Sequence, residues 1–137
     1  MLISGTIEYT KTTGETYEKK VQINTDEICN EKNNDILDAV AFALYGKTIF
    51  KEIVRLEPGL PFIVLTINSK NGTAVVGRKP EHYRVTHFGT EYNAKEYFSL
   101  TVNGIDYNED LSAEQYYQLL NEYLDLSYDE FVAYCRS

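Results

Sequence analysis

Apolar residues alternate with polar ones at the start of the chain, which is the period that one face of a β-strand requires. The first run contains Ile3, Gly5, Ile7 and Tyr9. A turn signal at Thr13-Gly14 follows, and the second run contains Tyr17, Val21 and Ile23. The two runs and the turn between them predict a β-hairpin.

Between residues 35 and 46 the apolar period lengthens to that of a helix. Asn34 or Asp35 can cap its start, and Asp38 is expected near the positive end of the helix dipole. Gly46 is well placed to end it. The apolar stripe is broad, so much of the helix surface should be buried; the stripe consists of Ile36, Leu37, Val40, Ala41 and Leu44.

After a connection over residues 51–61, the pattern returns to strands. The β-branched run FIVLTIN predicts a central strand. Asn71-Gly72 indicates a hairpin, and Asn103-Gly104 is the preferred pair for a tight type I′ turn into the residues that follow it. An antiparallel meander is therefore expected, with strands over 62–68, 73–78, 83–88 and 96–102.

Two helices are predicted at the end of the chain. Ser112 with Gln115, and Ser127 with Glu130, have the capping-box spacing, and apolar residues follow each pair at helical intervals. No repeat, linker or low-complexity tract divides the sequence. A single α+β domain over residues 1–137 is the expected fold class, with hairpins or a meander, one buried helix and two C-terminal helices.

The charge is concentrated in the last quarter of the chain. Of the formal net charge of −8, residues 103–137 contribute −7, from eight carboxylates and one arginine. Such a surface repels a phosphate backbone, which argues against direct nucleic-acid binding there. No apolar run approaches the roughly 20 residues of a membrane span, and no signal-peptide pattern opens the chain. A cytoplasmic protein without a membrane segment is therefore expected.

The segment ILDAVAFALYGKT, residues 36–48, resembles the first helix of SMC-like, SbcC-type DNA-repair ATPases. Later segments appear in the order of that family: FIVLTIN, HYRVTHFG, LTVNGIDY and LSYDEF. The resemblance covers nearly the whole chain but only one lobe of the ATPase head, lobe I. It implies the corresponding α+β lobe, derived from a protein that binds ATP and works with a nuclease.

In that family a glycine-rich phosphate loop opens this helix, whereas here the loop is degenerate. Residues 27–34 contain no glycine, and asparagines occupy the positions of the lysine and of the magnesium-binding hydroxyl. Nearby carboxylates would repel a triphosphate. We therefore expect a non-enzymatic pseudo-ATPase with no cofactor and no metal; the degenerate positions are Asn30, Glu31, Lys32, Asn33, Asn34 and Asp35.

Other candidate chemistry is sparse. Cys29 and Cys135 lie far apart in sequence and are interpreted as idle reduced thiols. His82 and His87 are expected on opposite faces of their strand. The acidic run 106–110 is interpreted as a solvated turn rather than as a cation site.

Twelve tyrosines and no tryptophan are present, and six of the tyrosines lie in the acidic last 35 residues. Because tyrosine is a favoured interface anchor, a partner-binding surface is one interpretation. The other is that Tyr116 and Tyr123 belong to the core and Tyr117 is simply exposed. The candidate partner-binding residues are Tyr116, Tyr117, Tyr123, Asp125, Asp129 and Glu130.

Three functions follow from these features. The first is a protein-interaction module that modulates an SMC-like ATPase or its nuclease subunit, as a phage or mobile-element protein would. The second is one half of a split ATPase that binds ATP only with a partner chain. The third is an acidic DNA mimic that binds a basic protein.

Overall fold

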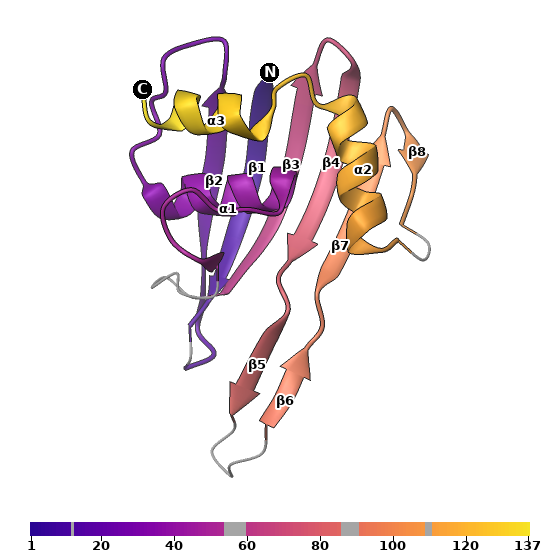
Figure 1. The fold of residues 1–137 in the computed structure, drawn as a ribbon. Helices are drawn as coiled ribbons and strands as arrows, with labels where there is room; N and C mark the ends of the chain where they lie inside the picture. The colour runs from indigo at the N-terminus through magenta and orange to yellow at the C-terminus, as the bar shows by residue number, and fades with distance from the viewer. Residues whose placement is uncertain (12, 54–59, 86–90, 109–110) are drawn as a thin grey trace.

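Six strands form one antiparallel sheet in the order β2-β1-β3-β4-β7-β8. The computed structural model describes residues 1–11, 13–53, 60–85, 91–108 and 111–137. Its main sheet consists of β1 (Leu2–Thr10), β2 (Thr16–Asn24), β3 (Leu60–Ser69), β4 (Gly72–Lys79), β7 (Tyr97–Val102) and β8 (Ile105–Asp106). A separate ribbon of β5 (His82–Val85) and β6 (Glu91–Ala94) projects beyond the ends of β4 and β7 (Figure 1).

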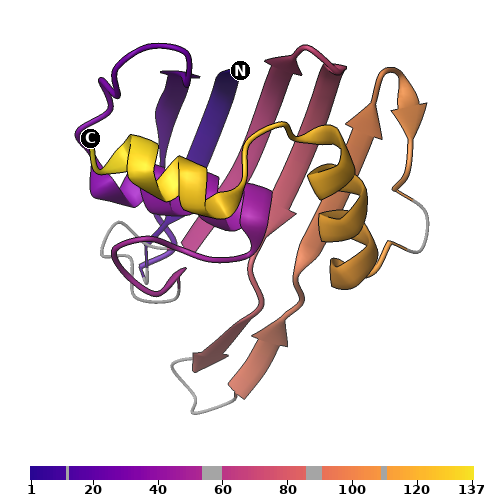
Figure 2. The same ribbon diagram turned by 45° about the horizontal axis from the view of Figure 1, so that its top comes forward.

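The helices α1 (Asn34–Tyr45), α2 (Ala113–Tyr123) and α3 (Tyr128–Cys135) all lie on one face of this sheet (Figure 2). α1 crosses the strands of the N-terminal half, α3 lies beside α1, and α2 lies over β7 (Figure 1). The chain is therefore a single α+β domain, as its hydrophobic pattern predicts. Among the described helices, none combines the length and apolar character needed to cross a membrane.

The alternation along each strand separates the two faces of the sheet. The side chains that point toward the helices form the core, and the larger ones include Ile3, Ile7, Tyr9, Ile63, Leu65, Ile67, Val76 and Leu100. On the opposite face none of the described helices covers the sheet (Figures 1 and 2). Four apolar side chains on that face, Leu2, Val64, Val75 and Tyr97, remain between 36% and 49% exposed.

The local signals are confirmed where the structure describes them. Asn103 and Gly104 have φ values of 50° and 82°, as a type I′ turn requires. Both capping boxes form, and Gly46 ends α1 in the left-handed conformation. One detail is corrected: Asn33, rather than Asn34 or Asp35, caps α1.

The strand expected over residues 83–88 is β5, and its last three residues lie outside the described ones. The pattern also missed β6, a strand of four residues. A strand this short contains too few alternations for its period to stand out from the neighbouring loops.

Candidate functional site

The N-terminus of α1, where the resemblance locates a phosphate loop, is closed by its own side chains. Asn33 Oδ1 accepts the amides of Asp35 at 3.0 Å and Ile36 at 3.4 Å. Glu31 Oε1 accepts the amide of Asn33 at 3.0 Å. These are amides that an anion at a helix N-terminus would use, so a phosphate would have to displace two capping side chains.

The segment before the helix has no phosphate-binding backbone. A nest of converging amides needs residues with positive φ, and none occurs over residues 25–33, all of which are described. Cys29 is buried, and the Lys32 ammonium contacts the Cys29 carbonyl at 3.5 Å instead of facing an open loop. Asp35 and Glu31 remain half-exposed beside the helix start. The local electrostatics therefore disfavour a triphosphate.

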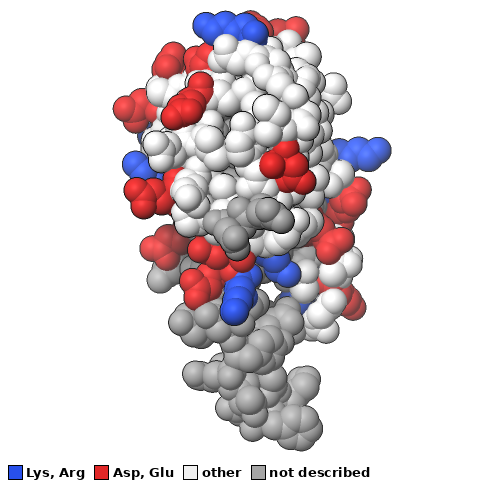
Figure 3. Space-filling model, turned by 90° about the vertical axis from the view of Figure 1, so that its right-hand side faces the viewer, with Lys and Arg blue, Asp and Glu red and all other residues white. Residues whose placement is uncertain are grey.

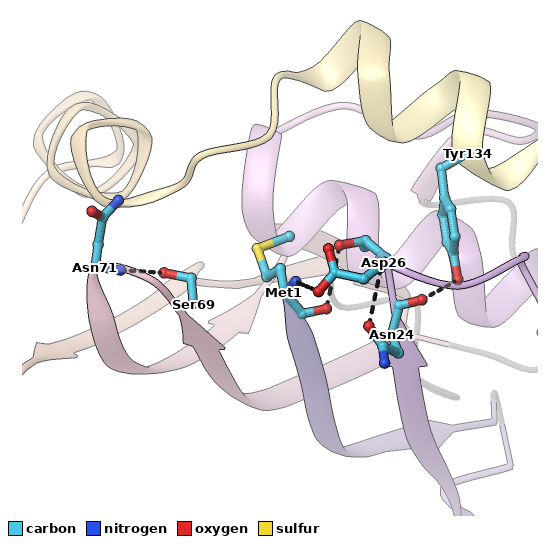
Figure 4. Close-up of polar contacts among 7 residues, drawn as sticks. Met1, Asn24, Asp26, Ser69, Asn71 and Tyr134 are labelled. Atoms are coloured by element: carbon cyan, nitrogen blue, oxygen red, sulfur yellow. Dashed lines mark hydrogen bonds and ion pairs between the residues drawn. The ribbon is translucent and has the colours of Figure 1, made fainter.

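The start of this segment is held against the N-terminal strand and α3 (Figure 4). The Met1 amine pairs with Asp26 at 3.0 Å, and the Thr25 amide donates to the Met1 carbonyl at 2.9 Å. The Tyr134 hydroxyl of α3 donates to the Asn24 carbonyl at 3.1 Å. These contacts fix the path of the chain between β2 and α1.

Asp38 has a role that its position in the sequence did not reveal. Its carboxylate is fully buried and accepts the amides of Ile49 and Phe50, each at 2.7 Å, and of Lys51 at 3.0 Å. It therefore anchors the segment that follows α1. The sequence-based expectation of a simple helix-dipole residue understates this role, because these partners lie 11 to 13 residues further along the chain.

Arg78 is the second buried charged residue that the pattern missed. Its guanidinium lies 4.6 Å from the ring centre of Phe42 and 4.0 Å from that of Phe98. Its Nε donates to the Tyr117 hydroxyl at 3.1 Å, and Glu96 is its carboxylate partner at 3.3 Å. The cation thus joins α1, β7 and α2, a stabilising role rather than a reactive one.

The tyrosines of α2 connect this helix to the rest of the core. Tyr116 is fully buried and donates to the Ala43 carbonyl at 2.7 Å, and Tyr117 donates to the Phe42 carbonyl at 2.8 Å. Both carbonyls belong to the last turn of α1, and the Phe42 carbonyl also accepts the Gly46 amide at 2.9 Å. Tyr123, 5% exposed, has its hydroxyl 2.8 Å from the Ile67 carbonyl.

These placements decide between the two interpretations of the tyrosines for Tyr116 and Tyr123, whose expected place in the core is confirmed. Tyr116 is fully buried and Tyr123 is 5% exposed, so neither offers a partner much accessible area. Tyr117 is half-buried, and its hydroxyl both donates a hydrogen bond and accepts one. Sequence spacing left both interpretations open, and it did not show that α1 supplies acceptors for Tyr116 and Tyr117.

The acidic candidates lie on the surface. Asp125, Asp129 and Glu130 are all exposed. Asp125 and Glu130 line a hollow of about 540 Å³ at the junction of α2 and α3, together with Lys47, whose ammonium lies over the Tyr128 ring. Hydrogen bonds from the Ser127 amide and hydroxyl hold the pKa of Glu130 below its usual value.

The remaining candidate residues are the two cysteines and the two histidines. Cys29 and Cys135 are free and buried. Burial, and next the neighbouring Cys29, raises the pKa of the Cys135 thiol to about 12, so thiolate is scarce at neutral pH. His87 and the side chain of His82 lie outside the described residues.

Comparison of the chain with protein-family models, with curated proteins and with solved structures finds no match.

Proposed function

We propose that the chain is a non-catalytic protein-interaction module built on one lobe of an SMC/SbcC-type ATPase head. The observation that carries the proposal is that side chains already occupy the amides at the N-terminus of α1, a region called the helix mouth below. Asn33 and Glu31 occupy the amides that would bind phosphate, while the helix itself is retained and buried. A scaffold retained without its nucleotide site suits contact with another protein better than hydrolysis.

The uncovered face of the sheet supports the same interpretation. On this face Val64 of β3 and Val75 of β4 stay partly exposed. The Tyr97 ring lies over Gly77 and packs against Phe62, with ring centres 5.6 Å apart. An isolated lobe of a larger head would leave such a face open to solvent. The rest of the head, or a partner protein, would cover it.

A nucleotide titration tests the first half of the proposal. We expect isothermal titration of the chain with ATP and magnesium to give no binding heat, because residues 25–33 form no amide nest and asparagine occupies the position of the magnesium-binding hydroxyl. A binding signal from the chain alone would refute the pseudo-ATPase assignment. Binding that arises only when a second chain is added would favour the split-ATPase alternative instead.

A defined reconstitution tests the second half. The chain is mixed with the purified SMC-like ATPase and nuclease subunits of its host, and complex formation and ATPase rate are measured. We expect a stable complex and a changed rate. Reversal of Asp125 and Asp129 to lysine tests the acidic helices, and reversal of Glu8 and Glu18, which lie on the open face of the sheet, tests that face with the same charge change. Absence of any complex with either subunit would refute the proposed partner.

Deletion of α2 is unsuitable for this purpose. Tyr116, Leu120 and Tyr123 contribute buried side chains from that helix to the core, so its removal would expose the sheet and α1. Substitutions of exposed residues leave this packing intact.

A further inference from the structure

A groove lies beside α2, between this helix and the chain that follows β8. Its volume is about 580 Å³. Its floor is formed by the half-buried Tyr107, Leu111 and Leu119, and its rim includes Asp106, Gln118 and Glu122. None of these residues belongs to the helix mouth or to the hollow at the junction of α2 and α3.

The floor is apolar, and one of its side chains has unused hydrogen-bonding capacity. Leu111 and Leu119 lie beside the core while keeping part of their surface open to the groove. Each of the other five C-terminal tyrosines places its hydroxyl on a backbone carbonyl. The Tyr107 hydroxyl has no such acceptor among the described residues. A partner inserted here would gain both apolar contact and an available hydroxyl.

The rim carries one sign of charge. No lysine or arginine is among the described residues that line the groove, whereas Asp106 and Glu122 are exposed carboxylates. Glu122 lies in the last turn of α2, which holds no basic residue. A helix C-terminus is the negative end of the dipole and favours a cation. The charge at this end of α2 is therefore uncompensated within the helix, and an incoming ammonium or guanidinium would offset it.

The side of the molecule that carries α2 and β8 shows the same pattern. In Figure 3 a broad uncharged surface is bordered mainly by carboxylates, and the few cations lie toward its margins. Apolar area surrounded by one sign of charge is complementary to a segment with apolar anchors and opposite charges.

We propose that this groove binds a basic amphipathic helix of a partner protein. The inference rests on the proposed interaction role and specifies the partner's contacting chemistry. Apolar side chains at helical spacing would pack on Leu111 and Leu119, and flanking lysines or arginines would lie against Asp106 and Glu122. A second copy of the chain does not fit, because a symmetric contact would place two acidic rims against each other.

A fluorescent helical peptide of leucine and lysine, about 15 to 18 residues long, is the probe. A leucine–glutamate peptide with the same pattern is its counterpart. Polarisation measures binding to the full chain and to three variants. Leu119→Gln removes an anchor contact without lowering helix propensity much, and Glu122→Lys reverses a rim charge. Glu18→Lys, on the distant edge strand β2, changes the net charge by the same amount as Glu122→Lys.

We expect the basic peptide to bind and the acidic one not to bind. Leu119→Gln and Glu122→Lys should each weaken binding about tenfold, which corresponds to about 1.4 kcal/mol. Glu18→Lys should weaken it less than threefold. Equal weakening by both charge reversals, or no effect of Leu119→Gln, would overturn the assignment, because the attraction would then be non-specific.

Amide chemical shifts locate the contact. Peptide-induced changes should centre on residues 106–108 and 111–122, and changes centred on the open sheet face would overturn the proposal. Concentration-dependent changes in the groove without peptide would indicate self-association and would also overturn it. Failure of the groove leaves the nucleotide titration and the reconstitution unaffected, so the two proposals fail separately.

Discussion

The buried carboxylate of Asp38 allows one interpretation of the structure to be tested by magnitude. A half-exposed first-turn carboxylate contributes about 0.3–1 kcal/mol through the helix dipole. Asp38 instead accepts three amides at 2.7–3.0 Å with no exposed surface. Hydrogen bonds to a charged group are worth about 1.5–3 kcal/mol each, so the gross loss on removal is about 4.5–9 kcal/mol.

Part of that loss is recovered. Removing the carboxylate also removes its desolvation cost, which amounts to several kcal/mol for a buried ion. Phe50 is 38% exposed, so water can reach part of the freed segment. We therefore expect Asp38→Ala to lower the free energy of unfolding by about 3 kcal/mol, and Asp38→Asn by about 2 kcal/mol because the amide keeps one acceptor oxygen.

The assay is urea unfolding followed by far-ultraviolet circular dichroism, with Asp35→Ala as the matched control. Asp35 lies in the first turn of the same helix, is half-exposed, and should cost less than about 1 kcal/mol when removed. For m-values of about 1.5–3 kcal/mol/M, Asp38→Ala should lower the midpoint by about 1–2 M urea. If the two alanine variants differ by less than about 1 kcal/mol, Asp38 does not anchor the segment after α1.

Three further predictions concern other parts of the fold. Gly5→Ala should destabilise the protein by at least about 3 kcal/mol in the same assay, because φ at Gly5 is 147° and a Cβ there would overlap a backbone carbonyl of β3. Tyr116→Phe should lower the free energy of unfolding by about 1–3 kcal/mol, because the Ala43 carbonyl loses its partner. The control Tyr97→Phe, at an exposed ring, should be nearly neutral, and equal effects would contradict the proposed role of the buried hydroxyl. The lowered pKa of Glu130 means that its stabilising contribution is fully present above the unfolded-state pKa of about 4.3 and is lost as the pH falls through the folded-state value. Between pH 7 and a pH below the folded-state pKa of Glu130, the free energy of unfolding should therefore fall less for Glu130→Gln than for the wild type. Equal decreases would argue against this capping contribution.

Local sequence signals predicted much of the secondary structure because their physical causes act over a few residues. The Asn103-Gly104 turn needs two positive φ values, and asparagine and glycine tolerate them. The capping boxes join residues three apart, Ser112 with Gln115 and Ser127 with Glu130. Alternation in the first strand likewise predicted one apolar face, and Ile3, Ile7 and Tyr9 are buried on it.

Local sequence patterns did not predict the side-chain contacts of the candidate site, as two examples show. The absence of glycine before α1 predicted an unsuitable phosphate loop, but not that Asn33 would cap the helix or that Glu31 would accept the Asn33 amide. Arg78 follows the apolar pair Val75-Val76 in β4, and its aromatic partners come from other elements of the fold. The hydrophobic periodicity of one segment does not show which side chains of other segments will pack against it.

The sequence by itself determined a single α+β domain, the place of its main turns and caps, the absence of glycine before α1 and the acidic character of residues 103–137. Only the tertiary structure decided that Tyr116 and Tyr117 donate to carbonyls of α1, that Asp38 holds a distant segment, and that an apolar groove lies beside α2. The reason is physical. Propensity, periodicity and formal charge are properties of short segments, whereas burial and hydrogen-bond partners exist only after segments far apart in the chain have packed together.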